Sequence, residues 1–226
     1  MSEETRPEEP RAEGTRSEER RPEGLDPAIA LVDLDSVAVG IVTADAMVKA
    51  APVGSIYTGT VHPGRYLVLV SGDTASVEEA LAVGLATGGG SVVDSVFLAD
   101  VHPAVSAAIV ATEERALHGG EALGIVETAT VATVIDAADA AVKAAAVELA
   151  AVRLADGLGG KGYALIVGAV ADVEAAIDGA RSRVAGSTAV ISYRVVAQLH
   201  DEVAVNLERD LRFNARLVAR PEERGA

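Results

Sequence analysis

The sequence contains no cysteine and no tryptophan, and it has only two phenylalanines and four tyrosines. Without cysteine the chain has no disulfide, no thiol nucleophile and no thiolate ligand for zinc or an iron–sulfur cluster. Few aromatic rings leave little surface for stacking nucleobases. Basic residues are also in deficit, since 19 lysines and arginines stand against 34 acids, a formal charge of -15. Nucleic acid and anionic membranes are therefore not expected as partners.

Long hydrophobic runs are absent as well, and none approaches the ~20 residues of a membrane span. Residues 1–26 carry nine acids and five arginines and no apolar segment, so they predict a disordered tail and neither a signal nor a transit peptide. The chain is instead rich in small apolar residues, because half of its 226 residues are hydrophobic. We expect a cytoplasmic protein with one large domain or two smaller ones.

One ten-residue phrase occurs twice in the chain. The segment ADAMVKAAPV (44–53) returns as ADAAVKAAAV (138–147), which lies 94 positions later. The similarity extends upstream without a gap, so that residues 30–53 lie over residues 124–147. A chance match in an alanine-rich chain would not extend this far.

The two copies continue to match downstream. After a two-residue shift, residues 62–81 lie over residues 158–177, and after a second such shift the copies end together at His102 and His200. The apolar periodicity is kept throughout. The chain therefore contains a duplicated domain.

Each copy has the pattern β-α-β-β-α-β-α. In the first copy we expect strands at 29–34, 53–61, 66–71 and 92–98, and helices at 37–51 and 75–86. In the second copy we expect strands at 123–128, 147–154, 163–168 and 188–196, and helices at 130–146 and 171–184. Asp35–Ser36 and Thr128 are the predicted N-caps of the first helix of each copy.

This order predicts an α+β fold of two tandem ferredoxin-like domains, each a four-stranded antiparallel sheet with helices on one face. We place the boundaries as follows: a disordered tail at 1–26, a first domain at 27–117, a second at 118–206, and a charged helical extension at 207–226.

The second copy carries a familiar series of motifs. Its segment EALGIVETATVATVIDAADAAVKAAAVEL (121–149) resembles the domain of bacterial microcompartment shell proteins, in which an ALGxIET strand precedes a DAADAxxKAAxVEL helix and strand. The resemblance is strong over residues 122–203 and weaker over residues 28–105. Two fused copies in unpermuted order resemble the tandem-domain (BMC) class of that family.

The resemblance implies a homotrimer whose six domains form a pseudohexagonal tile in a microcompartment shell. Its partners would be hexamers and pentamers of other shell proteins, together with encapsulated enzymes, and small metabolites would pass through a central pore. Carried onto this chain, the pore is lined by the loop between the second and third strands of each copy: Val61, His62, Pro63, Gly64, Gly157, Leu158, Gly159 and Gly160. Arg65 and Lys161 lie near the pore, and Lys49 and Lys143 match a lysine of the tile edge. No cofactor and no metal are implied.

The chain departs from the family pattern at the tile edge. Family hexamers have an arginine shortly before the histidine of a PRPH stretch, whereas Asp100 and Gln198 stand before His102 and His200 here. Edge contacts through that arginine are therefore not expected. Because the chain has no cysteine, the iron–sulfur cluster of some tandem relatives is also excluded, and the unpermuted order favours a single layer over stacked pairs.

Other functions remain as alternatives. The stretch DGLGGKG is not a Walker loop, because Gly162 follows Lys161 where a hydroxyl residue is required. The four histidines are not spaced as metal ligands, and duplication explains the equivalent acids Asp33 and Glu127. With no nucleophile–base pair in view, we do not expect an enzyme. The main alternative is a small-molecule-binding regulatory trimer of ferredoxin-like domains.

Overall fold

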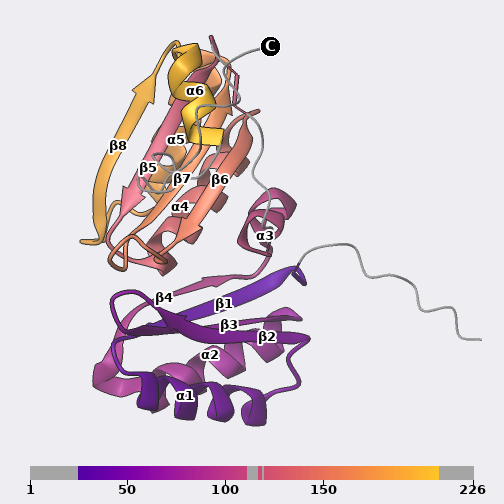
Figure 1. Cartoon of the computed structure of the whole chain (residues 1–226). Helices are drawn as coiled ribbons and strands as arrows, with labels where there is room; N and C mark the ends of the chain where they lie inside the picture. Colours follow the sequence, from indigo (N-terminus) through magenta and orange to yellow (C-terminus); the bar gives the residue numbers. More distant parts are fainter. Residues whose placement is uncertain (1–24, 111–116, 119, 209–226) are drawn as a thin grey trace, which may run out of the picture.

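The computed structural model describes residues 25–110, 117, 118 and 120–208. The expected N-terminal tail, apart from its last two residues, and most of the C-terminal extension lie outside the described residues. The described chain forms two four-stranded antiparallel sheets, with strand orders β2-β3-β1-β4 and β6-β7-β5-β8 (Figure 1). The expected α+β fold of two tandem units is confirmed.

The elements follow the expected order in both units. The first unit contains β1 (Ala28–Leu34), α1 (Val37–Ala50), β2 (Ser55–Val61), β3 (Arg65–Gly72), α2 (Thr74–Gly88), a 3-10 turn (Gly89–Ser91), β4 (Val92–Leu98) and α3 (Pro103–Val110). The second unit contains β5 (Ala122–Thr128), α4 (Val131–Ala144), β6 (Glu148–Leu154), β7 (Gly162–Gly168), α5 (Val170–Arg183), β8 (Val190–Val196) and α6 (Asp201–Glu208).

The N-caps of the first helices show one correct and one wrong prediction. Ser36 caps α1, since its hydroxyl accepts a hydrogen bond from the Val39 amide. The cap of α4 is Thr130 and not Thr128. Thr128 is still part of strand β5, where its buried hydroxyl donates to the carbonyls of Thr130 and Gly162. Its side chain is therefore used to fix the strand and the loop before the helix.

The core of the first unit lies between its sheet and its own two long helices. Alternate residues of β1 and β3, such as Val32 and Val68, point to this side and pack with Met47 of α1 and Val77 of α2. The period-2 pattern of the strands and the apolar stripe of each helix therefore meet as the sequence indicates.

The opposite face of the first sheet is covered by the second unit. Ile29 and Leu31 of β1 belong to one hydrophobic core with Val131 and Ile135 of α4. Helix α4 is thus enclosed between its own sheet and the first sheet, and ten of its fourteen residues are buried. Helix α1, its counterpart in the first unit, has four buried residues among fourteen. One intrachain interface therefore joins the two units.

Candidate functional site

The fold brings the two predicted pore loops together. The β2–β3 loop (62–64) and the β6–β7 loop (155–161) meet where the His62 Nδ1 atom lies 2.9 Å from the Asp156 Oδ1 atom. Both side chains are exposed. Loops from equivalent places in the two copies therefore lie next to each other.

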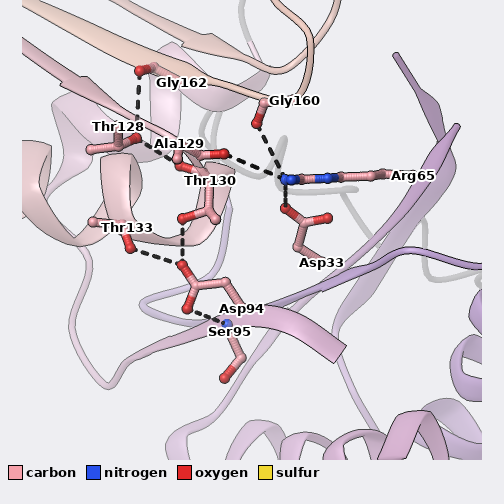
Figure 2. A network of polar contacts seen from close by, with 10 residues as sticks. All are labelled: Asp33, Arg65, Asp94, Ser95, Thr128, Ala129, Thr130, Thr133, Gly160 and Gly162. Atoms are coloured by element: carbon pink, nitrogen blue, oxygen red, sulfur yellow. Dashed lines mark hydrogen bonds and ion pairs between the residues drawn. The ribbon is translucent and has the colours of Figure 1, made fainter. Parts of the chain in front are cut away.

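Arg65, the first residue of β3, also connects the two loops. Its Nη1 atom donates to the Asp33 carboxylate at 3.0 Å and to the Gly160 carbonyl at 3.4 Å, and it reaches the Ala129 carbonyl at 3.5 Å (Figure 2). Asp33 and Arg65 belong to the first unit, whereas the two carbonyls belong to the second. One guanidinium thus joins both units at the base of the loops.

Asp33 is the buried acid of this contact. Burial raises the pKa of its carboxyl to about 6, against the opposing effect of the Arg65 guanidinium. Only one of its two oxygens has a hydrogen-bond partner, since Oδ1 is buried and unpaired. The ionised carboxylate is therefore incompletely stabilised in the folded chain.

This burial predicts a pH dependence of stability. Because the folded pKa of Asp33 lies above the ordinary value of 3.8, protonation favours the folded state as the pH falls through about 6. Relative to Asp33→Asn, the wild-type free energy of unfolding should rise by roughly 1–3 kcal/mol between pH 7 and pH 4. Urea unfolding of both proteins across this range measures the difference, and parallel profiles would contradict the assignment.

Asp94 extends the network to helix α4. It lies opposite Asp33 in the β1–β4 pair, and its carboxylate accepts hydrogen bonds from the hydroxyls of Thr130 and Thr133 (Figure 2). A carboxylate is favourable at this place, because the first turn of a helix presents unpaired amides and a positive dipole end. Asp94 therefore fixes the first turn of α4 on the first unit.

Glycine shapes the second loop. Gly157, Gly159 and Gly160 all adopt positive φ, a conformation that side chains with a Cβ rarely take. At Gly160 the space is also occupied, because an added Cβ would lie 3.0 Å from the Arg65 Cζ atom. The positive φ of Gly160 therefore favours glycine, and a larger residue would also have to displace the end of the Arg65 side chain.

The second copy has a weaker version of the same ion pair. Lys161 and Glu127, the repeat equivalents of Arg65 and Asp33, form a salt bridge at 3.0 Å between side chains that remain partly exposed. Arg65 and Lys161 both lie next to their loops, and their place near a pore stays a prediction. The difference is that a second unit covers the first pair, while the second pair faces outwards.

The two repeat-equivalent lysines also have different surroundings. Lys143 binds Asp139 at 2.6 Å and donates to the Asp100 carbonyl of the other unit. Lys49 binds Asp45 at the same distance and otherwise faces solvent. The structure thus places Lys143 at the intrachain interface, while the role of either lysine at a tile edge stays a prediction.

The intrachain interface has an uncovered counterpart on the same chain. Ile135 of α4 is fully buried against the first unit, whereas its repeat equivalent Ile41 of α1 is 54% exposed. On the receiving side Val105 of α3 is fully buried, whereas its equivalent Val203 of α6 is 48% exposed. Three further pairs behave in the same way, namely Val131 and Val37, Val142 and Val48, and Leu98 and Val196. We call Val37, Ile41 and Val48 the open α1 surface, and Val196 and Val203 the open sheet surface.

These surfaces were missed by sequence reasoning, as was the Asp94 network. The alignment of the copies held a signal for the network, because Asp94 and Thr133 have Ser192 and Val39 as their equivalents. The first copy alone has a carboxylate at the Asp94 position and the second copy alone has a hydroxyl at the Thr133 position, a difference that indicates a contact between the two copies. For the open surfaces no such signal existed, since both copies have apolar residues there.

Metal and membrane sites are not found in the part of the chain that the structure describes. There, no group of three or more His, Asp or Glu side chains is placed to hold a metal ion. Over the same residues, no helix has both the length and the apolar character needed to cross a bilayer.

Comparison with known proteins gives consistent matches. The BMC domain family model matches twice, at residues 28–101 and 122–199. The chain is 38% identical over 180 residues to the bacterial microcompartment shell protein PduT of Citrobacter freundii, a match that covers 79% of this chain and 96% of that protein. A crystal structure of a microcompartment protein from Desulfitobacterium hafniense DCB superposes with a TM-score of 0.68 at 37% identity, covering 79% of this chain and 98% of that one.

Proposed function

The chain belongs to the BMC domain family, with two copies of the domain in tandem, and from that premise we propose that it builds a trimeric pseudohexagonal tile of a microcompartment shell. Its role is structural. The tile would carry a central pore for small metabolites, and its neighbours would be other shell proteins.

The observation that carries the trimer is the burial of residues in one copy whose equivalents are exposed in the other. The intrachain interface shows how the first helix of one unit packs on the far face of another unit's sheet. The open α1 surface and the open sheet surface are equivalent to the two sides of this interface, but each is exposed in the single chain. Because they lie on different units, they join chains head to tail, and such a contact closes into a ring when its rotation allows. The resemblance to tandem shell proteins favours closure at three chains.

The pore proposal rests on the meeting of the two loops. In a ring of this kind, the β2–β3 and β6–β7 loops alternate around the axis, and the residues that face it are those predicted from the sequence, from Val61 to Gly64 and from Gly157 to Gly160. In each protomer of the ring, Arg65 would keep its contact with the Gly160 carbonyl and so hold the two loops of that protomer together. Selection would then be steric and electrostatic, with no chemical step.

Two other functions have less support. A small-molecule-binding regulatory trimer would use the same loops, but the relatives found are a microcompartment shell protein and a microcompartment protein, and they do not favour it. Within the part of the chain that the structure describes, the buried acid Asp33 is held by Arg65, and the curated relative found is named as a shell protein. We therefore propose that the protein is not an enzyme.

The assembly state tests the proposal. Chromatography with light scattering should give three chains of 23.0 kDa each. Electron microscopy with a hexameric shell protein present should then show flat layers that include this protein. A monomer would contradict the trimer, and a trimer that never enters a layer with any shell partner would contradict the tile.

A further inference from the structure

A short turn before α3 is held from the other unit by two side chains of α4. The His102 amide donates to the Asp139 Oδ1 atom at 2.7 Å. The Lys143 ammonium donates to the Asp100 carbonyl and is itself held by Asp139 at 2.6 Å. Asp139 and Lys143, four residues apart on α4, thus bind a backbone amide and a backbone carbonyl of the same turn.

The same turn occurs before α6. The carbonyl of His200 accepts from the Val203 and Ala204 amides at 2.9 and 3.0 Å, and the carbonyl of His102 accepts from the Val105 and Ser106 amides at 2.9 and 3.1 Å. In both turns the imidazole Nδ1 atom accepts from the amide two residues later, at 3.2 Å. The backbone around His200 is therefore formed like the backbone that Asp139 and Lys143 hold.

The same Asp–Lys pair occurs on both α1 and α4. Lys49 and Asp45 are 2.6 Å apart on α1, as Lys143 and Asp139 are on α4. The exposure of the two pairs differs: the side chains of Lys143 and Asp139 are 41% and 6% exposed, whereas those of Lys49 and Asp45 are 72% and 58% exposed. The α1 pair thus has the same geometry as the α4 pair, but it holds no turn of the described chain. We call such an Asp–Lys pair a clamp.

We infer that Asp45 and Lys49 clamp the turn before α6 of the neighbouring protomer, with the Asp45 carboxylate accepting from the His200 amide and the Lys49 ammonium donating to the Gln198 carbonyl. This inference rests on the proposed head-to-tail trimer. It gives Lys49 a role in holding the protomers of one tile together, beyond the tile edge that the resemblance implies.

The clamp has a consequence for helix α6. Within its own chain α6 packs through Ala204 and Leu207, while Val203 and Val205 remain about half exposed. In the first unit the equivalent of Val203, Val105, is buried in the core that the units share. The clamp therefore fixes the start of α6 in trans and brings Val203 against the neighbouring protomer, so that α6 becomes firmly held only in the assembled ring.

The variants Asp45→Ala and Lys49→Met test the clamp, with Glu79→Ala as a matched control because Glu79 is an exposed acid of α2, outside both open surfaces. Sedimentation equilibrium measures dissociation of the trimer, and hydrogen exchange measures protection of the α6 amides. Loss of one charge-assisted hydrogen bond per contact should weaken each contact about tenfold or more. Exchange at the Val203 and Ala204 amides should become faster, and Glu79→Ala should match the wild type in both measurements.

The outcomes separate the clamp from the trimer itself. If Asp45→Ala and Lys49→Met form trimers as tight as the wild type, with equal protection of α6, the clamp is wrong and the head-to-tail trimer stands. If the wild-type protein is a monomer at every concentration tested, the proposed function fails and the clamp fails with it.

Discussion

Replacement of Ile41 by aspartate should convert the proposed trimer into monomers. Ile41 is the most central residue of the open α1 surface in sequence, and more than half of its side chain is exposed in the single chain. The single chain should therefore still fold with aspartate at this position. In the ring, however, a charge would be buried without a partner at each of three equivalent contacts, which costs several kcal/mol each. Light scattering on the eluted protein should report one chain of 23.0 kDa.

Leu85→Asp is the matched control for this change. Leu85 is also an exposed large apolar residue, but it lies on α2, and its repeat equivalent on α5 is Arg181, which is exposed and pairs with Asp178 within the second unit. Leu85→Asp should remain a trimer. A trimer of Ile41→Asp, or equal dissociation of both variants, would show that α1 is not the contact surface.

Replacement of Ile135 by alanine should destabilise the chain itself. Ile135 is fully buried between its own sheet and the first sheet, so the change leaves a cavity in the core that joins the two units. Such a truncation costs about 2–5 kcal/mol of unfolding free energy. Urea unfolding should show this loss at every protein concentration, because the interface lies within one chain.

Ile41→Ala provides the paired measurement on the same sequence motif. It removes the same atoms from the equivalent position of α1, and its cost should appear only at concentrations where chains associate. A similar, concentration-independent loss for both variants would mean that Ile41 is already covered within the chain. A negligible loss for Ile135→Ala would mean that the two units are not joined through α4.

Much of the fold could be predicted from the sequence because it is encoded locally. The period-2 runs of β1 and β3, the apolar stripes of α1 and α4 and the glycines of the β6–β7 loop are visible in consecutive residues. The repeat of the ADAxVKAA motif, at 44–51 and 138–145, then indicated two units. The N-cap of α4 was misplaced because Thr128 and Thr130 are both good caps, and only the end of strand β5 decides between them.

The residues at the base of the loops could be predicted only in part. The positions of Arg65 and Lys161 near their loops follow from the strand boundaries. Their pairing with Asp33 and Glu127 was not predicted, because it depends on which strands are neighbours in the sheet. The contact of Arg65 with the Gly160 carbonyl joins residues 95 positions apart. No local pattern carries that information.

The sequence by itself determined that there are two units of one fold, which residues form their strands and helices, and which face of each helix is apolar. Only the tertiary structure decided which of those faces is covered. Helices α1 and α4 share nine of their fourteen residues, yet Ile135 is buried and Ile41 is exposed, because α4 packs on the first sheet while α1 has no second sheet against it in the described part of the chain. Periodicity in the sequence predicts which face of a helix is apolar. Whether that face is buried depends on which other elements pack against it.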